Sequence, residues 1–175
     1  MTKKIISIVG KTCTGKTTIG NILAEILGYN FYSMGEFYKN ELEGKIKDYN
    51  IIDELIEKQI DKLIYNNENI VIEGRTVEII ADKHNSKTDD INKTSIMLDV
   101  DLENQINRYI ERENITSKSA AEENIAKKDN FDEYRLFKKY GTNIFDKNNY
   151  NIVIDTSDLN INEVLDIILQ NTKNY

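Results

Sequence analysis

One stretch near the N-terminus constrains the fold more than any other feature. Residues 10–17 read GKTCTGKT and match the pattern G-x-x-x-x-G-K-[ST] at every fixed position. A β-branched run at 5–9 precedes this stretch, and apolar residues at helical spacing follow it from 16 to 27. A strand, a glycine-rich turn and the first turn of a helix, in that order, predict a phosphate-binding loop.

The residue types within this loop suit a nucleoside triphosphate. Its glycines let backbone N–H groups surround the phosphates, and the helix N-terminus adds partial positive charge. We expect Lys16 to reach the β- and γ-phosphates and the Thr17 hydroxyl to bind Mg²⁺. The residues predicted to bind ATP are Gly10, Lys11, Thr12, Cys13, Thr14, Gly15, Lys16, Thr17 and Thr18.

The rest of the chain alternates short β-branched runs with helical patterns. We expect strands at 5–9, 31–32, 70–72, 95–100 and 152–154, and helices at 16–27, 35–42, 51–65, 102–113 and 164–169. This alternation predicts an α/β fold with a five-stranded parallel sheet and helices on both faces. Residues 82–93 are expected to form a loop, and the polar stretch 117–140 a helical surface flap. No linker or internal repeat interrupts the 175 residues, which predicts a single domain over 1–175.

Composition excludes several classes of protein. The net charge of -7 and the pI of about 4.9 argue against a protein that coats nucleic acid or anionic lipid. No run approaches the roughly 20 apolar residues that a membrane span needs, and the start of the chain lacks the apolar length of a signal peptide. The single cysteine excludes an internal disulfide framework. We therefore expect a cytoplasmic monomer that binds neither nucleic acid nor membranes.

Arginine is scarce in this chain. The 23 basic residues comprise 19 lysines and four arginines, at positions 75, 108, 112 and 135. Because a guanidinium group grips phosphate through two parallel hydrogen bonds, an arginine in a lysine-rich background can mark a site that needs that geometry. Chance placement is the alternative for each of them.

Other nucleotide-binding classes fit less well. A GTPase would need an N-K-x-D motif to recognise guanine, and the sequence has none. Helicases and transporter ATPases are larger. The chain also contains no proline, so it cannot form the proline-bearing turn after the third strand that is usual in adenylate kinases. A phosphate loop in a chain of this length is typical of kinases for small molecules or nucleoside monophosphates.

Three further motifs follow the phosphate loop: SMGEFYK at 33–39, IEGR at 72–75 and KDNFDEYR at 128–135. With the loop, they resemble the short, archaeal-type form of the cytidylate (CMP/dCMP) kinase family over nearly the whole chain. The resemblance implies a P-loop NTPase fold with a helical lid, and transfer of the γ-phosphate of ATP to CMP or dCMP with Mg²⁺. It places the acceptor-binding part at about 33–66 and the lid at about 114–140.

The resemblance also implies roles for single residues. The acceptor would be bound by Ser33, Lys39, Gly74, Arg75, Asp132 and Arg135. The transferring phosphoryl group would be contacted by Lys16, Arg112, Lys128 and Arg135. Thr17 and Glu73 would bind the metal, and Arg108 would lie against the adenine beside the turn at 155–157.

Two departures from the family keep alternatives open. Lys39 and Lys128 stand where the family has arginine, and lysine does not reproduce a bidentate grip. The alternatives are another P-loop kinase for a nucleoside monophosphate or small molecule, and an ATP-binding regulator that does not turn ATP over. Among single residues, Glu73 is alternatively a partner that balances Arg75, and Asp132 a brace for Arg135. Asp129 and His84 are expected to be solvated surface residues, and Arg108 and Arg112 alternatively form a solvated helix face with neighbouring glutamates.

Overall fold

The computed structural model describes residues 3–85 and 91–172. Its centre is a five-stranded sheet in the order β2-β3-β1-β4-β5, in which every neighbouring pair is parallel. The strands are β1 (Lys3–Gly10), β2 (Asn30–Ser33), β3 (Asn69–Glu73), β4 (Ile91–Asp99) and β5 (Ile152–Asp155). The predicted five-stranded parallel sheet is confirmed.

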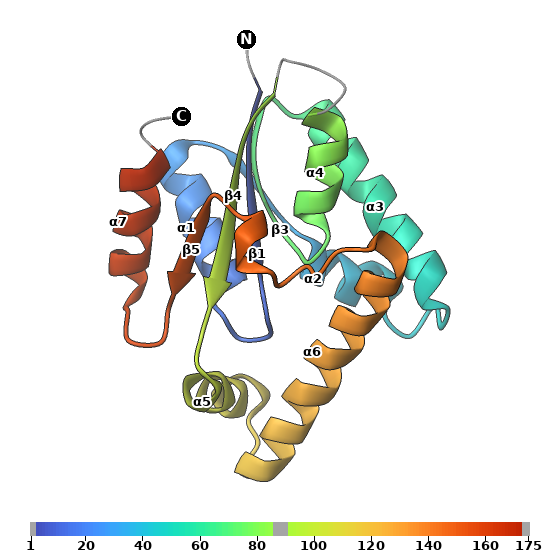
Figure 1. The fold of residues 1–175 in the computed structure, drawn as a ribbon, viewed down its shortest axis with the longest axis vertical. Coiled ribbons are helices and arrows are strands. Elements are labelled where there is room, and N and C mark those ends of the chain that lie inside the picture. Colours follow the sequence, from blue (N-terminus) through green and yellow to red (C-terminus); the bar gives the residue numbers. More distant parts are fainter. Residues whose placement is uncertain (1–2, 86–90, 173–175) are drawn as a thin grey trace.

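Helices cover both faces of this sheet. Figure 1 shows α1 (Lys16–Leu27) and α7 (Ile161–Thr172) on one side of it, and α3 (Tyr49–Asn66) and α4 (Val77–Asn85) on the other. Because both faces are covered, the strands consist of nearly continuous apolar runs.

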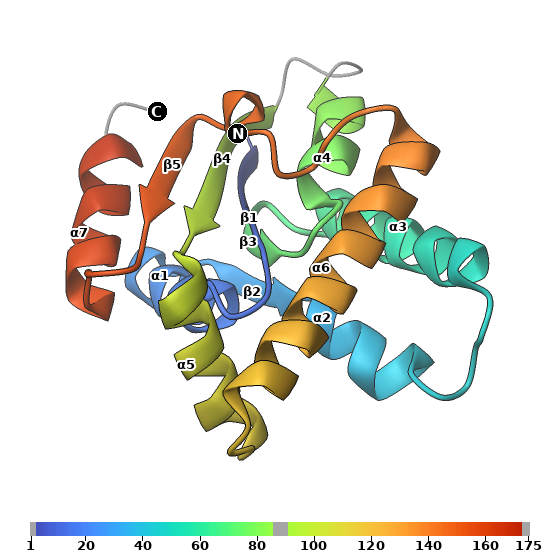
Figure 2. The same ribbon diagram turned by 60° about the horizontal axis from the view of Figure 1, so that its bottom comes forward.

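The remaining helical segments lie toward the carboxyl ends of the strands. After β2 comes the short helix α2 (Met34–Phe37), which continues into a π-helical turn, η1 (Tyr38–Leu42). In Figures 1 and 2, α5 (Leu102–Glu113) and the beginning of α6 (Lys118–Tyr140) lie beyond the carboxyl end of β4. A 3-10 turn, η2 (Lys147–Asn149), precedes β5. In the described part of the chain, no helix is long and apolar enough to cross a bilayer.

The core is divided by the alternation of side chains along the strands. In β1, Ile6 and Ile8 point toward α1 and α7, whereas Ile5 points toward α3 and α4. A third cluster joins Met97 of β4 to Leu136 of α6. These contacts fix the strand ends, from which the loops of the candidate site emerge.

Two expectations about local structure were wrong. Within the predicted loop 82–93, α4 continues to Asn85 and β4 already begins at Ile91, while residues 86–90 lie outside the described residues. Lys93 pairs with Glu78 and Asp82 of α4, which explains how a charged residue is accommodated in the strand. His84, expected in that loop, is on α4, with its Nε2 atom 2.7 Å from a carboxylate oxygen of Asp61.

The segment 117–140 is helical, as predicted, but it is not only a surface flap. Leu136 is 1% exposed in the core, and Asp129 is 4% exposed. Ala121 and Ile125 pack against Ile106 of α5. The buried residues of this helix lie on one stripe, whereas its aromatic residues Phe131, Tyr134 and Phe137 are exposed.

Truncating an isoleucine of α1 tests which face of this helix contributes to the free energy of unfolding. Ile19 is 3% exposed and Ile26 is 52% exposed. We expect Ile19→Ala to lower the free energy of unfolding by about 2–5 kcal/mol, because it leaves a cavity in the core. The matched Ile26→Ala change should cost less than about 1 kcal/mol. Urea denaturation followed by circular dichroism measures both, and equal losses would contradict the assigned packing.

Candidate active site

The phosphate loop connects β1 to α1 at the carboxyl edge of the sheet. A Cβ atom at Gly10 would lie 2.3 Å from the carbonyl oxygen of Leu98, so a side chain there would displace β4. Gly15 caps α1 with a φ of 90°, in the left-handed region that glycine adopts without steric cost. The structure therefore explains why the motif has glycine at both of its fixed glycine positions.

Lys16, the first residue of α1, turns back over the loop. Its Nζ atom donates a hydrogen bond to the Lys11 carbonyl oxygen at 2.6 Å and lies 3.5 Å from the Thr14 hydroxyl oxygen. Burial lowers the pKa of Lys16 to about 8, although the Glu73 carboxylate acts in the opposite direction. The ammonium group is thus held at the centre of the loop.

Three oxygen-bearing side chains meet beside the start of α1. Glu73, at the end of β3, is 3% exposed. The Thr17 hydroxyl donates to its Oε1 atom at 3.3 Å, and the Ser33 hydroxyl donates to the same atom. The two residues predicted to bind metal, Thr17 and Glu73, are therefore adjacent.

The donor set at this point fits Mg²⁺. This ion prefers oxygen ligands and is usually bound by one or two protein side chains, with water and substrate phosphates completing its shell. Within residues 3–85 and 91–172, no three Asp, Glu, His or Cys side chains are grouped to hold a metal on their own. Thr17 and Glu73 thus suit a Mg²⁺ ion that also depends on bound phosphates.

Arg75 follows β3 and reaches across to the phosphate loop. Its Nη2 atom donates to the Thr12 hydroxyl oxygen at 3.1 Å and to Oδ1 of Asp129 at 2.8 Å, and its Nη1 atom pairs with Asp132. The chain turns toward the loop at Gly74, where a Cβ atom would lie 2.8 Å from Cβ of Met34. The predicted corner at the end of β3 therefore does bring an arginine to the loop.

Asp132 bridges Arg135 and Arg75, because its carboxylate pairs with both guanidinium groups. Its Nη2 atom donates to Oδ1 of Asp132 at 2.9 Å, and its Nη1 atom pairs with the buried Asp53 of α3. Burial acts to lower the pKa of Arg135, but the two carboxylates outweigh it and raise that pKa above its ordinary value. Arg135 is thus held by both its own helix, α6, and α3.

The contact between α3 and α6 repeats at every helical turn. Three positions of α3, each four residues from the next, meet three positions of α6 with the same spacing: Tyr49 with Phe131, Asp53 with Arg135, and Glu57 with Lys139. The rings of the first pair meet edge to face with their centroids 4.8 Å apart. Two of these three contacts are between opposite charges.

The other two arginines differ from each other. Arg108 of α5 donates to the hydroxyl and carbonyl oxygens of Thr156 at 2.9 and 2.6 Å, and to the Cys13 carbonyl oxygen at 3.4 Å. It therefore joins the turn at 155–157 to the phosphate loop, where it was predicted to lie. Arg112 is exposed and pairs with Glu113 at 2.8 Å, which is the solvated arrangement given as its alternative.

The two lysines that replace family arginines do not take part in the contacts among Arg75, Asp132 and Arg135. Lys39 and Lys128 are exposed, and neither makes a hydrogen bond or ion pair with the described residues. Lys128 is nevertheless on the same helical stripe as Asp132 and Arg135, at spacings of four and seven residues. Their roles stay predictions.

Sequence reasoning missed Asp129 and Gln105. Asp129 was expected to be a solvated charge, but its carboxylate is buried and accepts hydrogen bonds from Thr12, Arg75 and Gln105. A signal for this was available: with Ala121, Ile125 and Leu136, Asp129 falls on the buried stripe of α6. An acid at such a position indicates a polar partner inside the fold.

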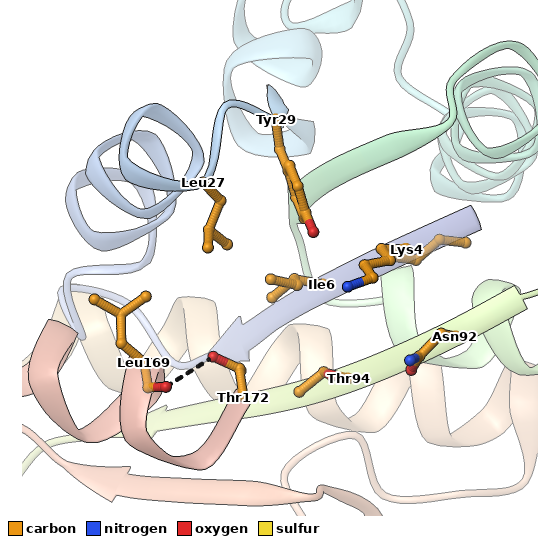
Figure 3. A pocket seen from close by; sticks show the side chains of 9 residues that line it. Lys4, Ile6, Leu27, Tyr29, Asn92, Thr94, Leu169 and Thr172 are labelled. Carbon is orange, nitrogen blue, oxygen red and sulfur yellow. Dashed lines mark hydrogen bonds between the residues drawn. The ribbon is translucent and has the colours of Figure 1, made fainter. Parts of the chain in front are cut away.

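A separate hollow lies at the opposite edge of the sheet. Figure 3 shows this cavity of about 290 Å³, at the amino ends of β1 and β4 and between α1 and α7. The side chains labelled there are Lys4, Ile6, Leu27, Tyr29, Asn92, Thr94, Leu169 and Thr172. In an open parallel sheet, ligands bind at the carboxyl ends of the strands, so we place the active site at the phosphate loop and not here.

The sequence of this chain is similar to those of cytidylate kinases. The model of the cytidylate kinase-like family matches residues 34–158. A cytidylate kinase from Thermoplasma acidophilum is 30% identical over 161 residues, which cover 86% of this chain and 82% of that one. A cytidylate kinase from Saccharolobus islandicus is 27% identical over 176 residues, covering 94% and 88%.

Solved structures support the fold. An uncharacterized protein from Eubacterium ventriosum has a TM-score of 0.78 at 21% identity, covering 99% of this chain and 100% of that one. Shikimate kinase from Acinetobacter baumannii has a TM-score of 0.59 at 18% identity, covering 98% and 94%. The predicted fold is thereby confirmed, and the chain shares it with this shikimate kinase.

The partly buried side chain of Lys16 predicts a pH-dependent stability. Its pKa is about 8 in the folded protein against an ordinary value of 10.5, so the unfolded chain binds more protons between these values. The free energy of unfolding, measured relative to that of Lys16→Met, should therefore rise by about 2 kcal/mol from pH 8 to pH 10. Urea denaturation at several pH values measures this difference, with the exposed Lys4→Met as the control. A difference that stays constant with pH would show that Lys16 is not desolvated.

Proposed function

The chain belongs to the cytidylate kinase-like family, and on that premise we propose that it transfers the γ-phosphate of ATP to CMP or dCMP, giving CDP or dCDP. The observation that carries this proposal is the position of Arg75, whose Nη2 atom lies 3.1 Å from the Thr12 hydroxyl oxygen of the phosphate loop. A guanidinium group at this distance can hold a second phosphate compound next to the first.

We assign ATP to the phosphate loop, with its phosphates on the backbone N–H groups of residues 10–18 and on Lys16. A bound phosphate would replace the Lys11 carbonyl oxygen as the partner of Lys16. Arg108 supports the assignment of the adenine, because its planar guanidinium group is fixed beside the loop and can stack on an aromatic ring.

We assign the acceptor to the space between residues 33–39 and the corner at Gly74 and Arg75. A cavity of about 290 Å³ runs along this segment, lined by Ser33, Phe37 and Gln59 among others. A phosphate dianion bound to Nη1 of Arg75 would take the place of Asp132. That carboxylate would then be free to accept a hydrogen bond from the exocyclic amine of cytosine.

Thr17 and Glu73 are the residues that would hold Mg²⁺. When bound, the ion would neutralise part of the negative charge of the phosphates. Ser33 supports this arrangement, because its hydrogen bond to Glu73 fixes the carboxylate beside the Thr17 hydroxyl.

Transfer of the phosphoryl group requires cations on several sides of that group, because they neutralise its negative charge. Lys16 and Arg135 are already placed near the loop and near Arg75, respectively. Arg112 and Lys128 are exposed, so we propose that they approach the phosphates when residues 114–140 close over bound nucleotides. Closure would also exclude water, which would otherwise hydrolyse ATP.

A screen of acceptors tests the assignment directly. The purified protein is incubated with MgATP and one of CMP, dCMP, UMP, AMP, shikimate or gluconate, and ADP formation and the phosphorylated product are both measured. We expect transfer to CMP or dCMP in preference to the other four.

Each other outcome selects an alternative. Transfer only to shikimate or gluconate would contradict the nucleotide acceptor and leave the kinase fold intact. ATP binding without transfer to any acceptor would favour a regulator, and calorimetric titration with CMP separates this case, because a protein that only senses ATP has no reason to bind CMP.

Removing the ammonium group of the loop should abolish most of the activity. We expect Lys16→Ala to lower kcat at least about 100-fold, because the charge that develops on the transferring group loses its nearest cation. The control is Lys4→Ala at the opposite edge of the sheet, which should keep full activity. If turnover by Lys16→Ala stays within a few-fold of the parent protein, the assigned mechanism is wrong.

A further inference from the structure

Asp129 is the most extensively bonded carboxylate near the phosphate loop. Its Oδ1 atom accepts hydrogen bonds from the Thr12 backbone N–H at 3.1 Å, the Thr12 hydroxyl at 2.8 Å and Nη2 of Arg75 at 2.8 Å. Its Oδ2 atom accepts one from Nε2 of Gln105 at 2.9 Å. Desolvating a carboxylate is costly, and these four bonds offset that cost.

The four bonds come from three separate parts of the chain. Thr12 belongs to the phosphate loop, Arg75 to the corner after β3, and Gln105 to α5. Gln105 also donates to the Thr12 carbonyl oxygen at 2.8 Å, so it contacts both Asp129 and the loop. The carboxylate therefore joins the loop that would hold ATP to the arginine that would hold the acceptor.

The bonds also fix the direction of Arg75. Thr12, Asp129 and Nη2 of Arg75 form a closed triangle of hydrogen bonds, with the Thr12 hydroxyl and the carboxylate both accepting from the same nitrogen. Because the guanidinium group is planar and rigid, holding Nη2 limits where Nη1 and Nε can point. Leu136, which lies on the same stripe of α6 as Asp129, is buried in the core.

We propose that Asp129 is a positioning residue that holds Arg75 against the phosphate loop, and that Gln105 orients Asp129 for this purpose. The distance between an acceptor phosphate on Arg75 and the loop is then set before any nucleotide binds. The part of the proposal that concerns an acceptor rests on the proposed function, whereas the placing of Arg75 does not.

The first test needs no substrate. The chain has only four arginines, so the side-chain Nε–H signals of a ¹⁵N-labelled sample can be told apart. We expect Asp129→Asn to shift the Arg75 side-chain signal and the Thr12 backbone signal, and to leave the Arg108 side-chain signal in place. The matched control is Glu123→Gln, which removes one negative charge from an exposed position of the same helix. An unchanged Arg75 signal in Asp129→Asn would overturn the proposal.

A milder variant covers the case in which Asp129→Asn does not fold. Gln105→Met removes one hydrogen bond to Asp129 and leaves its ion pair with Arg75. We expect the same two signals to shift, by less and in the same direction. No shift in a folded Gln105→Met protein would remove Gln105 from the proposal, and no shift in either variant would refute it.

The second test is a double-mutant cycle in the transfer reaction, with whichever acceptor the parent protein phosphorylates. We expect Asp129→Asn and Arg75→Lys each to lower kcat/KM for the acceptor at least tenfold. If Asp129 acts through Arg75, the double variant should be no more than about threefold worse than the poorer single variant. Losses that multiply would mean that Asp129 acts independently of Arg75, as a purely structural residue would.

The two tests separate the two proposals. A parent protein that phosphorylates no acceptor contradicts the proposed function, and the side-chain signals then still decide whether Asp129 places Arg75. An active parent protein with multiplying losses contradicts this inference and leaves the proposed function standing.

Discussion

Position 10 lies so close to β4 that a side chain there would meet the carbonyl oxygen of Leu98. Because position 10 has no room for a side chain, the chain can pass close to β4 as it leaves β1. The left-handed conformation of Gly15 then turns the chain into α1. Lys16 then begins the helix at the carboxyl edge of the sheet, and Arg75 arrives at the same edge because β3 is the parallel neighbour of β1. The site is therefore a consequence of strand order and of one close approach between backbones.

Three of the four arginines are held by oxygen acceptors, whereas the two lysines that replace family arginines are not. Arg75, Arg108 and Arg135 each contact two or more fixed oxygen acceptors, whereas Lys39 and Lys128 extend into solvent. A planar guanidinium fork can be held by several acceptors at once, whereas an ammonium group is a single charge on a flexible stem. Lys16 and Lys93 show that an ammonium group is also held where oxygen acceptors surround it. Arg112, which is exposed and pairs with Glu113, is the exception, so scarcity alone did not distinguish it from the other three arginines.

The strand–loop–helix motif and the β-branched runs were enough to predict the five-stranded parallel sheet and the glycine-rich turn between β1 and α1. Local patterns failed where a distant partner decides the outcome. Residues 91–93 were expected in a loop but begin β4, and no local pattern reveals that Glu78 and Asp82 neutralise Lys93 there. Asp129 was misjudged for a related reason: its partners Thr12 and Gln105 are 117 and 24 residues away.

The row of contacts between α3 and α6 has a consequence in acid. Burial of Glu57 opposes its ionisation, but hydrogen bonds from Lys139 and Tyr140 outweigh that effect and hold the pKa of Glu57 below its ordinary value. Its contribution to stability is present near neutrality and disappears as the pH falls through that lowered pKa. Acidification therefore removes the stabilisation that this contact between α3 and the last turn of α6 provides.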